Sequence, residues 1–134
     1  MIELSTTTAL ELSPGQAITF DSIPLKTGCA ECTRTGTGSV KLRANGVYVV
    51  TFSGNIGATA ATTAAQLSIQ LGGITIPEST MISTTAAAGD LNNVSTTIPI
   101  RNCCCDYDRI TVVNTGTSTV NVGKGAMLYV RRVS

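Results

Sequence analysis

A chain of 134 residues is long enough for one domain with a hydrophobic core and too short for two. Its formal net charge of +1 and its three Tyr and two Phe residues give neither the basic field nor the stacking surfaces that nucleic acids need, so nucleic acid is not an expected partner. Only 13% of the residues are charged while 43% are hydrophobic, and we expect much of the surface to be buried against partners.

The composition also indicates the class of fold. Thr, Ser, Gly, Ala and Val dominate, as is typical of an all-β sandwich or barrel. The uncharged segment between Arg43 and Glu78 is interrupted by Thr, Gly, Ala, Gln and Asn, so we expect no membrane span. The first five residues show no basic region followed by an apolar one, which predicts synthesis in the cytoplasm without a signal peptide.

Period-two alternation predicts short strands along the chain, here taken as a single domain, 1–134. Residues 1–11 are expected to form an N-terminal arm or a leading strand. A strand over 18–23 follows the turn signal Pro14-Gly15, and a strand over 39–43 follows Gly-Thr-Gly. All of these elements are short, as the strands of packed sheets usually are.

The clearest strand is predicted over 47–56, after the turn signal Asn45-Gly46. Successive side chains of a strand point to opposite faces of the sheet. One face therefore carries Tyr48, Val50, Phe52 and Ile56, and the other carries Val49, Thr51 and Ser53.

The middle of the chain continues this pattern. Residues 66–71 alternate polar and apolar side chains without exception, and shorter extended pieces follow at 74–77 and 79–82. A further strand over 94–100 contains Pro99, which predicts an edge or bulge position.

The remaining segments are predicted as connections and as the last two strands. The Ala/Thr segment 58–65 and the polar segment 83–93 are expected to be loops, because Thr is a poor helix former and no apolar stripe recurs. Strands over 109–114 and 120–133 are expected to form a hairpin through 115–119. Gly72-Gly73 and Gly123-Lys124-Gly125 lack the context of a phosphate-binding loop and are expected to be turns or bulges.

The order of these features resembles the globular heads of the complement and tumour-necrosis-factor superfamily, in the version found in bacterial spore-surface proteins and phages. The matching segments span nearly the whole chain from residue 12; they are Gly15–Asp21, Gly36–Gly38, Asn45–Ser53, Asp108–Asn114 and Gly125–Arg132. The resemblance implies a ten-stranded jelly-roll β-sandwich (TNF-like) that packs as a homotrimer, with the last strand of each subunit near the threefold axis.

The resemblance also implies which residues line the contact between subunits. They are Tyr129 and its neighbours Met127 and Arg131. The alternative is that Tyr129 fills the core of its own subunit, since buried aromatic side chains serve either role.

Enzymatic chemistry is not indicated. The chain has no His, which removes the commonest general base and every catalytic arrangement or zinc site that requires one. The eight carboxylates are scattered, and only Asp106 and Asp108 form a close pair. Clustered carboxylates can bind calcium, but a solvated turn is the favoured interpretation of this pair. We therefore expect no catalytic residues and no enzyme.

The five cysteines fall into two groups. Cys29 and Cys32 have the spacing of a zinc knuckle or a redox pair, and Cys103, Cys104 and Cys105 could supply further thiolates. Adjacent side chains on a strand point to opposite faces, so Cys103 with Cys105 is the easier pair of ligands. Reduced structural thiols are favoured over a disulfide and over zinc or an intersubunit cluster. No other cofactor is expected.

These features predict a non-enzymatic structural protein of a virion surface, namely a trimeric capsid decoration or head-fibre module of a phage. Its expected partners are its own copies and capsid or other virion proteins. No Gly-X-Y stalk precedes the head, which favours a free-standing trimer docked on a larger assembly. One alternative is the trimeric adhesive head of a spore or cell-surface protein that binds glycans or a receptor. A Cys-dependent enzyme or metal-thiolate module is the other.

Overall fold

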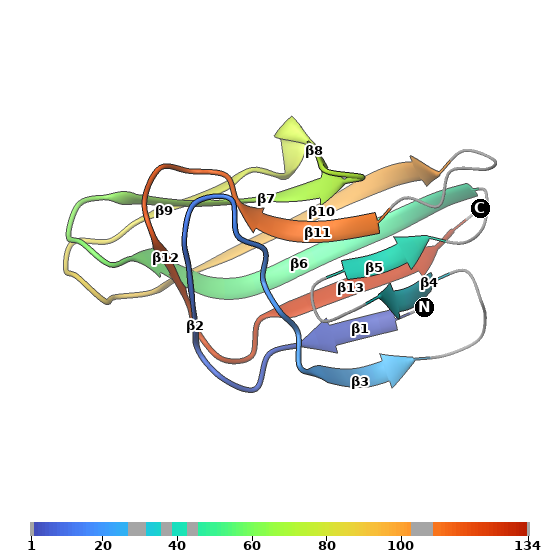
Figure 1. The fold of residues 1–134 in the computed structure, drawn as a ribbon, viewed down its shortest axis with the longest axis horizontal. Helices are drawn as coiled ribbons and strands as arrows, with labels where there is room; N and C mark the ends of the chain where they lie inside the picture. The colour runs from blue at the N-terminus through green and yellow to red at the C-terminus, as the bar shows by residue number, and fades with distance from the viewer. Residues whose placement is uncertain (1, 27–31, 36–38, 43–45, 103–108, 134) are drawn as a thin grey trace.

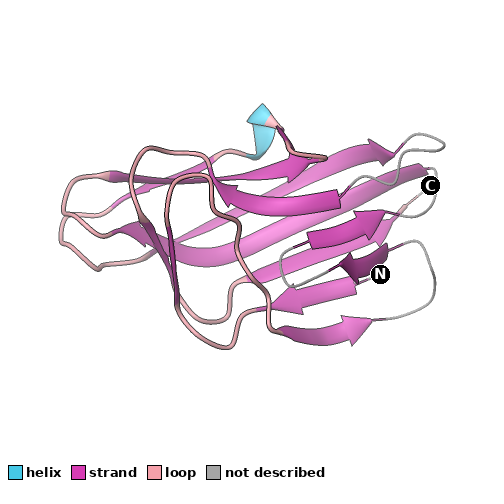
Figure 2. Cartoon of the chain, in the orientation of Figure 1, coloured by secondary structure: helices cyan, strands magenta, loops and turns pink. Residues whose placement is uncertain are grey.

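Alternating apolar and polar residues form strands along almost the whole chain. The computed structural model describes residues 2–26, 32–35, 39–42, 46–102 and 109–133, which form thirteen strands and one short 3-10 helix (Figures 1 and 2). The strands make two sheets that enclose one hydrophobic core, as the composition predicts for a β-sandwich. The described residues contain no helix long and apolar enough to cross a bilayer.

The first sheet has seven strands built around β6 (Gly46–Ala58). One edge of β6 pairs with all of β10 (Asn92–Asn102), and its other edge pairs with β13 (Met127–Arg132) and then with β12 (Val120–Val122). The sheet is completed beyond β13 by β1 (Ile2–Ser5) and β3 (Ser22–Lys26), and beyond β12 by β2 (Leu10–Leu12). Because β10 pairs only with β6 in this sheet, Pro99 has the edge position that the sequence predicts.

The second sheet has six strands. Its path runs from β4 (Cys32–Thr35) through β5 (Ser39–Leu42), β11 (Arg109–Asn114) and β7 (Ala64–Leu71) to β8 (Ile74–Thr75). The strand β9 (Met81–Thr84) also pairs with β7, and the 3-10 helix η1 (Pro77–Ser79) connects β8 to β9. The helical turn thus begins at the last residue of the extended piece predicted over 74–77 and ends at the first residue of the piece predicted over 79–82.

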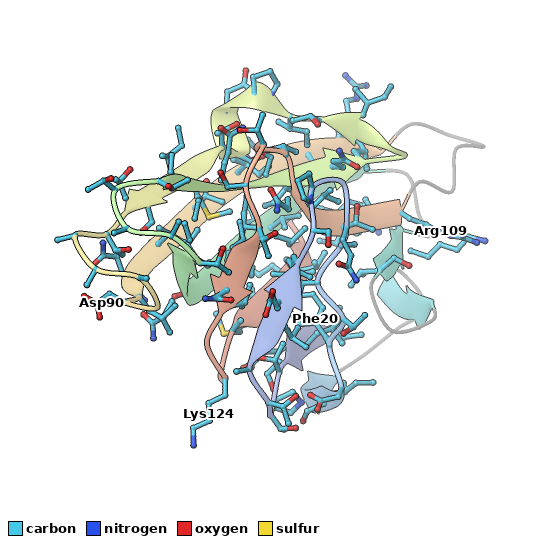
Figure 3. All side chains as sticks on the ribbon, turned by 60° about the vertical axis from the view of Figure 1, so that its left-hand side comes forward. Phe20, Asp90, Arg109 and Lys124 are labelled. Atoms are coloured by element: carbon cyan, nitrogen blue, oxygen red, sulfur yellow. The ribbon has the colours of Figure 1, made fainter. Side chains whose placement is uncertain are left out.

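The core lies between the two sheets. Tyr48 and Phe52 of β6 and Phe20 from the connection before β3 are fully buried, and Figure 3 shows Phe20 inside the sandwich. The other large, fully buried side chains are Ile2, Leu4, Ile18, Leu42, Ile56, Leu67, Ile69, Ile110 and Leu128. Val49 and Thr51 are only half-buried, so the predicted division of this strand into an inner and an outer face is confirmed.

The predicted strand over 18–23 is wrong in its position. Ile18 and Phe20 are buried with the expected alternation, but the backbone here forms only an isolated bridge between Ala17 and Val113. At Ala17 the chain lies beside β11 of the second sheet, and by Ser22 it pairs with Ser5 of β1 in the first sheet. No single strand can supply partners along such a crossing, so the regular strand starts at Ser22.

The predicted hairpin between 109–114 and 120–133 is also wrong. The strand β11 belongs to the second sheet and β12 to the first, so residues 115–119 cross between sheets. The predicted last strand is divided into β12 and β13 by a turn in which Gly125 has a φ of +87°. Alternation is the same whichever strand is the partner, and therefore it does not distinguish a hairpin from a crossing.

The short strands β2, β4, β8 and β12 bring the number above the ten that the resemblance implies. The N-terminal residues are a leading strand, β1, followed by β2. The predicted Ala/Thr loop is confirmed for residues 59–63, with β6 and β7 extending into its two ends, and the second polar connection spans 85–91.

Candidate functional site

The outward side of the seven-stranded sheet is the candidate functional surface. In β13, Leu128 and Val130 are fully buried, whereas Met127 and Tyr129 are half-buried and Arg131 is exposed. Because side chains alternate along a strand, all three residues that the resemblance assigns to the subunit contact project away from the core. The alternative in which Tyr129 fills the core of its own subunit does not apply.

Strand register places uncharged residues beside Tyr129. Thr51 of β6 lies opposite Tyr129, and Thr97 of β10 lies opposite Thr51. The hydroxyl oxygens of the two threonines are 3.1 Å apart, within hydrogen-bond distance. We define the outer face as the set Val47, Val49, Thr51, Ser53, Ser95, Thr97, Pro99, Met127, Tyr129 and Arg131.

The charges of this surface lie at its margins. Arg131 is opposite Val49, and Arg101 is opposite Val47, towards one end of the sheet. Glu3 of β1 lies opposite Tyr129 on the other side. A centre depleted of charge and supplied with Tyr and Met, with Arg at the rim, is typical of a protein interface. The arrangement can therefore bind another protein surface.

The edge of the same sheet adds to this surface. The strand β10 is eleven residues long, carries no charge from Asn92 to Ile100, and pairs on one side only within this sheet. A long, uncharged edge strand is a template for pairing with another chain unless something covers it. The outer face and this edge are continuous through Thr97, which lies opposite Thr51.

The predicted thiol site falls mostly on residues that the structure does not describe. Cys29, Cys103, Cys104 and Cys105 lie outside the described residues, and Cys32 begins β4 with its backbone opposite Leu42. Asp106 and Asp108 also lie outside the described residues. Within the described ranges, no group of three or more Cys, Asp and Glu is placed to hold a metal. The zinc alternative stays a prediction.

One of the scattered carboxylates has a structural role. Asp21 accepts a hydrogen bond from the backbone N–H of Thr7 at 2.8 Å and a second one from the Thr7 hydroxyl. These bonds fasten the connection after β1 to the residue before β3. Gly72, Gly73 and Gly125 lie in turns, as expected, with φ of +60°, +85° and +87°.

The resemblance names Tyr129, Met127 and Arg131, but the sequence does not show which residues of other strands lie beside them on the outer face. Thr51 was assigned to the outward side of its strand, but its neighbours Thr97 and Tyr129 are 46 and 78 positions away. Alternation indicates which side of a strand a residue occupies, whereas only the register shows which residues share a patch.

Comparison with known proteins supports the fold. No protein-family model and no curated protein matches the sequence. The globular domain of zebrafish complement 1qA protein is similar in structure, with a TM-score of 0.72 and 11% identity over 99% of this chain and 96% of that chain. The Eiger TNF of S. frugiperda has a TM-score of 0.72 and 15% identity over 99% of this chain and 91% of its own.

A more distant similarity is to the PRD1 vertex protein P5, with a TM-score of 0.52 and 15% identity over 99% of this chain and 96% of that chain. The chain therefore has the C1q/TNF-like jelly-roll fold, and the resemblance drawn from its sequence is confirmed at the level of fold. Proteins of this fold are typically non-enzymatic binding modules and usually form homotrimers.

Proposed function

We propose that this chain is a non-enzymatic structural protein of a virion surface, which works as a homotrimeric capsid decoration or head-fibre module of a phage. Its partners would be its own copies and capsid or other virion proteins. The fold does not by itself define a function, so the proposal depends on the surface and on the kind of protein that shares this architecture.

The outer face supports the trimer. Val49, Thr51 and Tyr129 form an uncharged, half-buried patch, and the adjacent edge strand β10 is also uncharged up to Ile100. Covering both in one contact would remove apolar surface from water, which contributes about 25 cal/mol for each Å² buried. It would also protect the free edge from uncontrolled pairing.

The observation that carries the virion assignment is the similarity to the PRD1 vertex protein P5, which extends over 99% of this chain and 96% of that one. The match includes the whole sandwich rather than a shared hairpin. The chain has no His, which is the commonest general base. A structural module fits these features better than a catalytic one does.

Two measurements test the proposal. Sedimentation equilibrium of the purified chain at micromolar concentration should give three times the mass of one subunit, and a stable monomer would refute the trimer. Mass spectrometry of purified particles from the source virus should find the chain in stoichiometric amounts. Its absence from the particles would refute the virion assignment and leave the trimer intact.

The second candidate is an adhesive head on a spore or cell surface that binds glycans or a receptor. It is favoured by the exposed, uncharged connection 59–62, which lies at the same end of the sandwich as the connection 85–91 in Figure 1. Loops carried on a rigid scaffold are common binding elements. Saturable binding of the isolated trimer on a glycan array, together with absence from particles, would favour this candidate.

A further inference from the structure

A small pocket lies beyond the end of the outer face, on the same side of the seven-stranded sheet, where three distant parts of the chain meet. It is lined by Ala9, Leu10 and Glu11 at β2, by Gly89 and Leu91 in the connection before β10, and by Asn121, Val122 and Gly123 at β12. Its volume is about 340 Å³, near the lower end of the range for ligand sites. A pocket of this size accommodates a single side chain or a similarly small molecule.

One wall of the pocket is the connection 85–91, which lies directly over β6 and β12. A Cβ atom at Gly57 would overlap the carbonyl oxygen of Asp90, and a Cβ atom at Gly123 would lie 3.0 Å from Cδ1 of Leu91. A glycine within β6 and a glycine directly after β12 therefore allow the connection to approach the sheet closely. Its turn is held by the N–H of Asp90, which donates to the carbonyl of Ala87 at 3.3 Å.

The opposite wall carries the polar groups. Glu11 and Asn121 are directly opposite each other in the antiparallel pair β2–β12, so their side chains are cross-strand neighbours on one face. Within the described part of the chain, neither side chain has a hydrogen-bond or ion-pair partner. Lys124 follows the pocket residue Gly123, but in Figure 3 its side chain extends away from the molecule. The pocket thus combines a carboxylate and an amide oxygen with the apolar side chain of Leu91, while the side chains of Leu10 and Val122 pack on the core side of their strands.

We infer that this pocket receives the side chain of a lysine that a partner protein presents. The ammonium group would pair with the Glu11 carboxylate and donate to the amide oxygen of Asn121. The apolar stem would pack against Leu91, as lysine stems do on apolar surfaces. This site does not depend on the virion assignment, because the isolated chain is sufficient to test it.

Lysine fits the lining better than arginine does. Arginine sites usually offer a bidentate carboxylate in plane with the guanidinium, or an aromatic ring on which that group stacks. The pocket lining contains no aromatic side chain. A compact ammonium group on a flexible stem requires only acceptors beside an apolar surface; Glu11 and Asn121 supply the acceptors and Leu91 the apolar surface.

The test is a titration of the isotopically labelled full chain, followed by amide NMR shifts, with three capped tripeptides: Gly-Lys-Gly, Gly-Arg-Gly and Gly-norleucine-Gly. We expect the lysine peptide to shift the amides of 9–11, 89–91 and 121–123 with a millimolar Kd that weakens as salt is added. The norleucine peptide has the same stem without the charge and should bind at least about tenfold more weakly, a difference of about 1.4 kcal/mol.

Matched variants make the test specific. Glu11→Gln keeps the shape of the side chain and should weaken lysine binding by about tenfold, whereas Glu78→Gln changes another exposed glutamate and should leave the Kd unchanged. Leu91→Ala should weaken the lysine and norleucine peptides alike, because it removes part of the apolar wall. Equal binding of the lysine and norleucine peptides, an unchanged Kd in Glu11→Gln, or shifts centred outside the pocket would each overturn the proposal.

Discussion

The hydroxyl oxygens of Thr51 and Thr97 lie 3.1 Å apart on neighbouring strands, at the centre of the outer face. A hydrogen bond between the two hydroxyls gives each group a partner without a charge, which lowers the cost of desolvation when the patch is covered. This pair joins β6 to the edge strand β10. It is therefore the position at which a charge should disturb the proposed trimer most.

Thr51→Arg should convert the trimer to a folded monomer. The guanidinium would be buried in the contact without a carboxylate partner, and an unpaired buried charge costs several kcal/mol. Sedimentation should show the mass falling threefold, with the β-type circular dichroism spectrum retained. Thr84→Arg makes the same change at an exposed position of β9 in the other sheet and should stay trimeric. A trimeric Thr51→Arg would place the contact elsewhere.

The buried amide of Asn114 stabilises the crossing between the two sheets. Its Nδ2 donates to the carbonyls of Leu12 at 3.1 Å and Ser118 at 2.8 Å, and its Oδ1 accepts from the N–H of Gly116 at 3.0 Å. Asn114→Asp replaces the donor by an oxygen that faces two carbonyls. We expect the free energy of unfolding to fall by about 2–4 kcal/mol, since each buried group left without a partner costs about 1–3 kcal/mol.

Urea unfolding at one fixed protein concentration measures this change, because the stability of an oligomer depends on concentration. Asn93→Asp is the matched control. The side chain of Asn93 is exposed and makes one hydrogen bond of 3.3 Å to Asn55, so its effect should stay within about 0.5 kcal/mol. Equal losses in the two variants would show that the amide of Asn114 does not support the crossing.

The inner and outer faces of the strands could be predicted from the sequence, because side-chain direction in a strand has a strict period of two. Tyr48 and Phe52 are buried as expected, and Val49 and Thr51 are on the other side. The same pattern does not specify a strand's partner. Val120 fits the alternation expected of a hairpin with 109–114. It pairs instead with Leu12 and Ala58 in the seven-stranded sheet, whereas β11 lies in the six-stranded sheet.

The lysine pocket had no signal in the sequence for a related reason. Glu11 and Asn121 are separated by 110 positions and become neighbours only through the pairing of β2 with β12. Gly57 is a strand residue with no turn around it, and the reason for a glycine there is the carbonyl of Asp90 from a distant connection. Contacts of this kind depend on the register between strands, which local patterns do not encode.

The five cysteines should be reduced and free of metal. The odd number of cysteines favours thiols over a complete disulfide framework. Titration with a thiol reagent in guanidinium chloride, without a reducing agent, should give five thiols per chain. Elemental analysis of the native protein should find no stoichiometric zinc. Three thiols per chain would indicate one disulfide, and one zinc per chain, or one per trimer, would establish the metal alternative.

Gly57→Ala should loosen the connection 85–91 without altering the backbone preference of β6. The φ of Gly57 lies outside the left-handed region, so alanine suits its conformation, and the effect comes from the overlap of the new methyl group with the carbonyl of Asp90. We expect a loss of about 1–3 kcal/mol in the free energy of unfolding, as for other overpacked sites. Amide exchange in 85–91 should become faster, and lysine-peptide binding should weaken.

Gly15→Ala is the converse control. The position has open space around its Cβ but a φ of +85°, so the substitution should cost about 1 kcal/mol through the backbone alone. It should leave exchange in 85–91 unchanged, and the same result for Gly57→Ala would contradict the role assigned to the close approach over β6.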